Sequence, residues 1–186
     1  VDSEMFSPMK RDMAWRRSLG IADDEIAISF AGRLVKEKNT AIYMRVMNML
    51  TERGLKVKPL VIGDGPEMAA MTAGLKNGVF AGFLHAQELA RAYASSDIFF
   101  FPSESETFGN VTLEAMASGL PAVNAISSGS NSLVVEGETG HLVSARDEQG
   151  LAAKLEVLAT DEGLRQRMGE AARARALTFS WDAILS

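Results

Sequence analysis

Short, continuously apolar stretches alternate along this chain with amphipathic stretches of helical period. Continuous apolar runs are typical of strands that are buried on both faces of a sheet. The expected strands cover residues 26–31, 57–62, 79–83, 98–101, 121–125 and 140–143. The expected helices cover residues 40–53, 67–76, 87–94, 111–118, 148–159 and 161–176. This order predicts an α/β fold, a doubly wound parallel sheet with helices on both faces.

The length and the apolar content agree with one domain. The chain has 186 residues, of which 47% are apolar, enough for an ordinary core. We expect a leading segment and helix over residues 1–20, an α/β core over 21–143 and flanking helices over 144–186. The first residue is Val1, and a new helix that begins near Thr178 has room for only about one turn. We therefore expect a piece of a longer protein.

Charge and residue usage exclude several classes of function. A formal charge of −5 argues against nucleic acid as a partner, because such affinity comes from clustered Lys and Arg. The chain has no cysteine, which excludes disulfides, thiolate zinc sites and a cysteine nucleophile, and fits a cytoplasmic protein. His85 and His141 lack partners at metal or triad spacing, so we expect both in surface loops and no metal site.

Loops that follow the strands should meet at one edge of the sheet. Right-handed crossovers place every strand-to-helix loop along the carboxyl edge, where ligands bind in such folds. The loops concerned cover residues 33–39, 63–66, 82–85 and 103–110. In the first, Arg33 and Lys38, with Lys36 as an alternative, could both reach one diphosphate; a solvated charged turn is the ordinary interpretation.

The second loop, Gly63-Asp64-Gly65-Pro66, allows a backbone to approach a ligand closely. A plain tight turn would have the same composition. It is not a dinucleotide fingerprint, because Met68 stands where a third glycine would be needed.

Residues 101–121 are the most informative segment, because a buried strand leads there through a polar loop into a helix. Two carboxylates, Glu106 and Glu114, flank a helix start near Gly109 or Asn110, where free amide groups and the positive end of the dipole can receive an anion. Glu114 has apolar neighbours and could accept ribose hydroxyls, although an exposed helix glutamate is the simpler alternative. Glu106 could accept sugar hydroxyls or act as a base or nucleophile, with Glu104 as the competing candidate.

Four segments carry a resemblance to a known family: residues 30–39, 61–66, 106–121 and 137–140. In this order they resemble the C-terminal, donor-binding domain of retaining GT-B glycosyltransferases, a Rossmann-like fold whose Glu-x7-Glu pair matches Glu106 and Glu114. The resemblance implies that Arg33, Lys38 and Glu106 serve catalysis. The residues expected to bind the donor nucleotide sugar are Gly32, Arg33, Lys38, Gly63, Asp64, Gly65, Phe83, Leu84, Glu106, Thr107, Phe108, Gly109, Asn110, Leu113 and Glu114.

The resemblance implies transfer of a hexosyl group, with retention, from a UDP- or GDP-sugar to a hydroxyl of a lipid or glycan. No tightly bound cofactor is expected, since Arg33, Lys38 and the helix start would stabilise the leaving diphosphate as a divalent ion does elsewhere. The N-terminal acceptor domain is absent, so the isolated chain should be inactive. With a membrane lipid as acceptor, the full-length protein would lie at the inner membrane face.

One segment departs from the common pattern of the family. Residues 127–132, a serine-rich loop, stand where many relatives have two glycines and a following glutamate. They are closer to a branch of bacterial α-mannosyl- and glucosyltransferases. A sugar-nucleotide epimerase of the same architecture and a non-catalytic nucleotide-sugar-binding module remain the alternatives.

Overall fold

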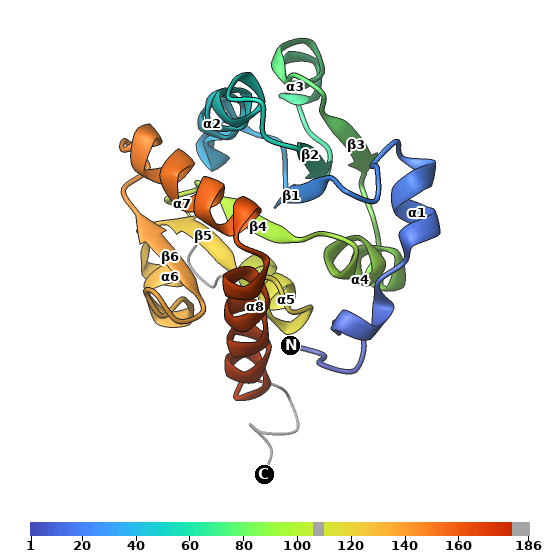
Figure 1. The fold of residues 1–186 in the computed structure, drawn as a ribbon, viewed down its shortest axis with the longest axis vertical. Coiled ribbons are helices and arrows are strands. Elements are labelled where there is room, and N and C mark those ends of the chain that lie inside the picture. Colours follow the sequence, from blue (N-terminus) through green and yellow to red (C-terminus); the bar gives the residue numbers. More distant parts are fainter. Residues whose placement is uncertain (106–109, 180–186) are drawn as a thin grey trace.

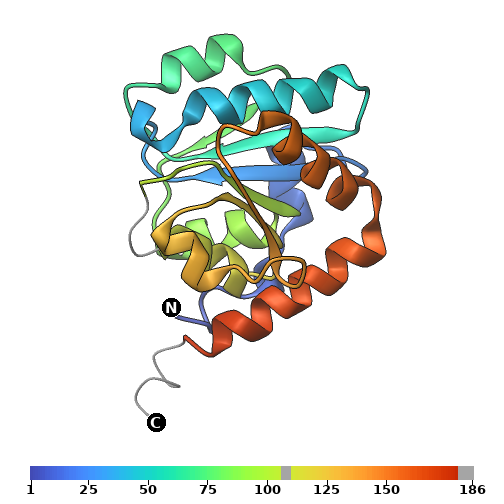
Figure 2. The same ribbon diagram turned by 90° about the vertical axis from the view of Figure 1, so that its left-hand side faces the viewer.

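A six-stranded, all-parallel sheet lies between two layers of helices in the computed structural model, which describes residues 1–105 and 110–179 (Figures 1 and 2). The strands are β1 (Ile26–Ala31), β2 (Val57–Ile62), β3 (Val79–Gly82), β4 (Ile98–Phe101), β5 (Ala122–Ala125) and β6 (Gly140–Val143). Their order is β3-β2-β1-β4-β5-β6. The predicted doubly wound sheet is therefore confirmed.

The helices are α1 (Met13–Ser18), α2 (Thr40–Glu52), α3 (Met68–Gly74), α4 (Ala86–Ala94), α5 (Asn110–Ala117), α6 (Ser128–Leu133), α7 (Glu148–Thr160) and α8 (Glu162–Leu177), with the short 3-10 helices η1 (Pro8–Lys10) and η2 (Lys36–Lys38). On one face of the sheet α2 packs against α3 and α7. On the other, α4 packs against α5, and α8 lies along α5 (Figure 2). Among the described helices, none has the length and apolar content to cross a membrane.

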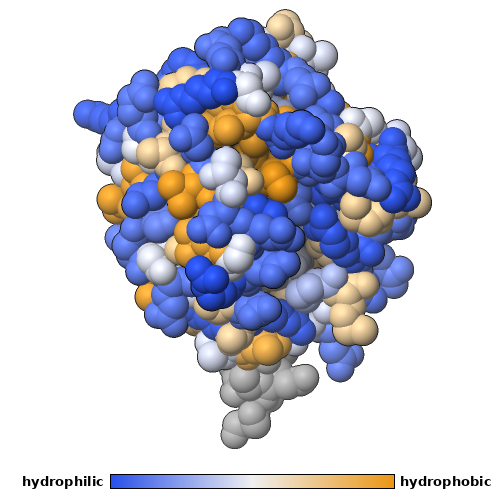
Figure 3. Space-filling view, viewed as in Figure 1, coloured by the Kyte–Doolittle hydropathy of each residue, from blue (hydrophilic) through white to orange (hydrophobic). Residues whose placement is uncertain are grey.

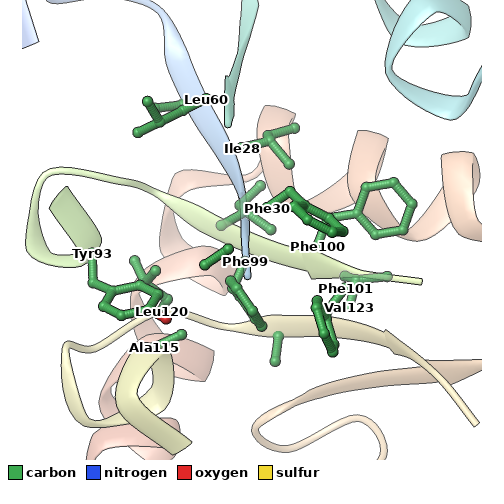
Figure 4. Packing of buried hydrophobic residues seen from close by; sticks show 14 of the residues in the cluster. Ile28, Phe30, Leu60, Tyr93, Phe99, Phe100, Phe101, Ala115, Leu120 and Val123 are labelled. Carbon is green, nitrogen blue, oxygen red and sulfur yellow. The ribbon is translucent and has the colours of Figure 1, made fainter. Parts of the chain in front are cut away.

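The central strand β4 shows why its sequence is continuously apolar. Phe99, Phe100 and Phe101 are all fully buried. The ring of Phe100 lies 5.4 Å from that of Tyr43 on α2, whereas the ring of Phe99 lies 6.1 Å from that of Tyr93 on α4, on the other face (Figure 4). Because helices cover both faces of β4, every position of the strand needs an apolar side chain.

The two halves of the sheet meet along β1 and β4. Six residue pairs join β1 to β2, but only two, Ile28 with Ile98 and Ser29 with Phe99, join β1 to β4. At the amino end of this junction the carboxylate of Asp97 accepts from the amide of Ala27 at 2.7 Å. The same carboxylate is paired with Arg16, which is fully buried, at 2.8 Å.

Most expected elements are present with ends that shift by no more than two residues; the helix expected over residues 67–76, for example, is Met68–Gly74. The expectation of a loop over residues 127–132 is wrong. The hydroxyl of Ser127 accepts from the amide of Ser130 at 3.1 Å and so caps α6. Serine is a strong N-cap residue, and this property was missed in the serine-rich sequence.

The surface position expected for His141 is also wrong. This side chain is 8% exposed on β6, and its Nδ1 lies 2.9 Å from Oε1 of Glu136. The carboxylate partner satisfies the ring and allows it to be buried in the strand. His85, by contrast, is exposed directly before α4, as expected.

The surface in the view of Figure 3 is mostly hydrophilic, with apolar areas interrupted by polar side chains. The large apolar side chains that are most exposed come from separate elements: Met9, Phe83, Ile126, Val157 and Leu177. Of these, Phe83 is 68% exposed and directly follows β3, which places it at the carboxyl edge of the sheet.

Candidate functional site

The loops that follow β1 and β2 are joined backbone to backbone. The amide of Gly32 donates to the carbonyl of Ile62 at 3.0 Å, and the amide of Leu34 donates to the carbonyl of Asp64 at 2.9 Å. Gly63 has a φ of 136°, and a Cβ at this position would collide with the carbonyl of Gly32. Only glycine allows the two loops to approach so closely. The predicted close approach of this backbone to a ligand stays a prediction.

A cavity of about 630 Å³ lies at these loops, within the usual size range of small-molecule sites. It brings together residues that follow three neighbouring strands, with further walls from α4 and α5. Its lining residues are Ala31, Gly32, Arg33, Ile62, Gly63, Asp64, Gly65, Phe83, Leu84, Leu89, Tyr93 and Val111. The cavity therefore gathers many of the residues that the sequence assigned to the donor, among them Arg33 as its cation.

A larger cavity, of about 740 Å³, lies at the opposite edge of the sheet. Its arginines hold the protein together: one Nη of Arg173 donates to three backbone carbonyls, and Arg11 is paired with Asp97 at 2.9 Å. Ligands of doubly wound sheets bind at the carboxyl edge. We therefore assign the candidate site to the smaller cavity.

The predicted cations Arg33 and Lys38 lie in one loop but in different surroundings. Arg33 is exposed at the mouth of the cavity. Lys38 is half-buried, ends η2 and does not line the cavity. The next residue, Asn39, connects η2 to α2 in a left-handed backbone conformation and was not among the predicted site residues. Its signal in the sequence is that asparagine is one of the few residues that tolerate this conformation.

Glu114 occupies the half-buried side of α5, as its apolar neighbours indicated. Burial raises the pKa of its carboxyl from 4.5 to about 7, against weaker opposing effects from the hydroxyl of Tyr93 and the amino group of Val1. The Tyr93 hydroxyl donates to Oε1 of Glu114 at 3.5 Å. Tyr93 lines the cavity, whereas Glu114 does not, so this fully buried tyrosine connects the carboxyl to the site.

Tyr93 was missed in the sequence, where it belongs to an apolar helix face and its ring packs in the core. The available signal was its hydroxyl, because a buried tyrosine usually needs a hydrogen-bond partner. Leu89 and Val111 were missed as well; as apolar wall residues they have no signature that distinguishes them from core residues.

Other predicted site residues come from the segment before and within α5. Glu106, Thr107, Phe108 and Gly109 lie outside the described residues. Asn110 is exposed as the first residue of α5, and Leu113 is partly buried against the core. Glu104, the competing acid, is exposed, and its Oε1 accepts from the side-chain amide of Asn39 at 3.3 Å.

Across residues 1–105 and 110–179, no three His, Cys, Asp or Glu side chains are grouped so that they could hold a metal ion. Among the described residues of the loop after β1, the cationic side chains are those of Arg33, Lys36 and Lys38.

Comparison with known proteins agrees with this geometry. The family model of glycosyl transferases group 1 matches residues 12–175. The chain is 38% identical to a sulfoquinovosyl transferase of Arabidopsis thaliana over 98% of this chain and 36% of that protein. It is 33% identical to a GDP-mannose-dependent alpha-mannosyltransferase of Corynebacterium glutamicum over 99% of this chain and 43% of that protein.

The fold matches a solved structure as well. HepE of Anabaena, solved in complex with UDP and glucose, superimposes with a TM-score of 0.84 over 100% of this chain and 52% of that one, at 24% identity. The chain thus spans about half, or less, of the length of the proteins that it matches. The chain belongs to the glycosyl transferases group 1 family and has the fold of the C-terminal domain of GT-B glycosyltransferases.

Proposed function

We propose that the cavity at the carboxyl edge binds a nucleoside-diphosphate sugar, and that the longer protein transfers the hexosyl group, with retention, to a hydroxyl of a lipid or glycan. One observation carries the proposal. The loops after β1, β2 and β3 enclose a single cavity that combines a cation, Arg33, with closely approaching glycine backbone and an exposed aromatic ring, Phe83. A diphosphate, a ribose and a base require these three kinds of surface.

In this proposal the chemical task of the domain is to stabilise the departing diphosphate. Arg33 and Lys38 supply positive charge where the negative charge of the leaving group develops, and the start of α5 adds its amide groups. A charge-assisted hydrogen bond of this kind contributes about 1.5–3 kcal/mol. In the same proposal Glu114 accepts hydroxyls of the ribose and Glu106 contacts the sugar, and Thr107, Phe108, Gly109 and Asn110 also bind the donor.

The donor is a UDP- or a GDP-sugar. The two nucleotides are supported by different proteins: the structural neighbour from Anabaena was solved with UDP and glucose, and the relative from Corynebacterium glutamicum depends on GDP-mannose. The acceptor would be bound by a further domain of the longer protein. With a lipid as acceptor, that protein would work at the cytoplasmic face of the membrane.

A nucleotide panel tests the proposal. Calorimetric titration of the chain with UDP, GDP and ADP, each with and without an attached sugar, should show saturable binding of UDP or GDP and weaker binding of ADP. Binding that requires no added metal ion would agree with the assigned roles of Arg33 and Lys38. If none of the three nucleotides binds, the domain is no donor site.

A further inference from the structure

Asn39 occupies a backbone conformation that few side chains tolerate. It has a φ of 57° and a ψ of 42° and forms both the C-cap of η2 and the N-cap of α2. Glycine would fit this position without strain, and asparagine is among the best tolerated alternatives. Its side chain makes no capping hydrogen bond to α2, and the hydrogen-bond partners of its amide group lie elsewhere.

Those contacts reach across to the loop that follows β4. Nδ2 of Asn39 donates to the carbonyl of Pro102 at 2.9 Å and to Oε1 of Glu104 at 3.3 Å. A second contact runs parallel to these, because the hydroxyl of Ser105 donates to the carbonyl of Glu37 at 3.3 Å. The loop that carries Arg33 and Lys38 is thus attached to the segment in front of the proposed acid Glu106.

The same loop is also attached on its other side. The amide of Leu34 donates to the carbonyl of Asp64, and the carbonyl of Leu34 accepts from the amide of Glu67, both at 2.9 Å. A Cβ on Gly65 would lie 2.5 Å from that carbonyl. Because β1 lies between β2 and β4 in the sheet, the loop of residues 32–39 is held by both neighbouring loops.

We propose that Asn39 is a positioning residue that fixes Lys38 against the second phosphate of a nucleoside diphosphate. The inference rests on the proposed function. The backbone of this loop is fixed at Leu34 by the β2 side, and at Glu37 and Asn39 by the β4 side. Without the amide of Asn39, Lys38 would keep its charge, but the residue after it would no longer be held by the β4 side. The position of the Lys38 ammonium group would then be less fixed, and sites of this kind depend on the exact position of their charged groups.

The test uses Asn39→Gly, which keeps the left-handed backbone available and removes only the side-chain contacts. Its matched control is Asn77→Gly. Asn77 also has a positive φ, 60°, and makes one side-chain contact, from Lys58 at 2.8 Å, but it precedes β3 at the opposite edge of the sheet. Affinities of both variants and of the unaltered chain are measured for UDP, UMP, GDP and GMP.

We expect Asn39→Gly to weaken binding of the diphosphate about tenfold and binding of the monophosphate less than about twofold, because it removes both hydrogen bonds that hold residue 39 in place. Asn77→Gly should leave both affinities unchanged. An equal loss for diphosphate and monophosphate, or a lower melting temperature alone, would show that Asn39 is only structural and would overturn the inference.

Two further outcomes can be distinguished from a failure of the positioning role. If the unaltered chain binds neither UDP nor GDP, the proposed function itself fails. If Asn39→Gly does not fold, Ser105→Ala decides, because it removes the parallel contact to Glu37 without changing the backbone at residue 39. This variant should show the same selective loss for the diphosphate, and an unchanged ratio of diphosphate to monophosphate affinity refutes the positioning role.

Discussion

Replacement of Glu114 by glutamine should make the protein more stable at neutral pH. Burial holds the pKa of this carboxyl at about 7 instead of 4.5. Since the folded state binds the proton more tightly than the unfolded state, the contribution of Glu114 to stability is complete below about pH 4.5 and is lost as the pH rises through about 7. The difference between the two pKa values corresponds to about 3 kcal/mol, and partial exposure reduces this to about 2 kcal/mol.

Glutamine resembles the protonated acid in shape and can accept from the hydroxyl of Tyr93, but it does not ionise. The free energies of unfolding of Glu114→Gln and of the unaltered protein should therefore agree near pH 4 and differ by about 2 kcal/mol near pH 8, with the variant more stable. Urea unfolding at several pH values measures this difference. Glu170→Gln, a change at an exposed position of α8, is the control.

A stability difference that does not change between these pH values would refute the reasoning, because it would mean that the carboxyl is not held neutral by burial. A less stable variant at pH 8 would refute it as well. If the variant is more stable and also binds UDP or GDP more weakly, the buried acid is retained for binding at a cost in stability.

Three further predictions concern the walls of the site. Tyr93→Phe should raise the pKa of Glu114 further, so the pH at which stability falls should move upward in urea unfolding; an unmoved midpoint would show that the 3.5 Å contact is without effect. Gly63→Ala should destabilise the fold by about 1–3 kcal/mol more than Gly54→Ala, whose Cβ would meet nothing within 4 Å; equal melting temperatures would contradict the packing of the two loops. Arg33→Ala should weaken the binding of UDP or GDP about 10- to 100-fold without a change in melting temperature. The control Arg45→Ala, which removes the partner of Glu148 on α7, should leave the affinity unchanged; equal affinities of both variants would show that Arg33 does not bind the nucleotide.

The order of strands and helices was predictable because each strand is buried on both faces and so has a continuous apolar run, as in Phe99, Phe100 and Phe101 of β4. The carboxyl-edge loops were predictable for the same reason, since parallel strands share one direction. These two features located Arg33, the Gly63 loop and Phe83 in one cavity.

Contacts between side chains far apart in the sequence were not predictable. In the sequence, Arg16 is one of several charged residues of a short amphipathic helix. In the structure it is fully buried and paired with Asp97, 81 residues further along the chain. The prediction for His141 was wrong because its partner Glu136 comes close to it only when the turn between the two residues has formed. Tyr93 and Asn39 were not predicted as site residues, because the hydrogen-bond partner of a single hydroxyl or amide group is known only from the folded structure.

The short ladder between β1 and β4 has a mechanical consequence. With two residue pairs, it is the shortest ladder between the described strands, and it is accompanied by hydrogen bonds of Asp97 at its amino end and of Asn39 at its carboxyl end. The candidate cavity has walls on both sides of this ladder. Gly63 and Phe83 follow β2 and β3, whereas Tyr93 and Val111 lie on α4 and α5. A bound nucleotide would therefore contact both sides of the β1–β4 ladder and stabilise it. The amides of Ile28 and Ser29 should then exchange hydrogen more slowly when the nucleotide is bound.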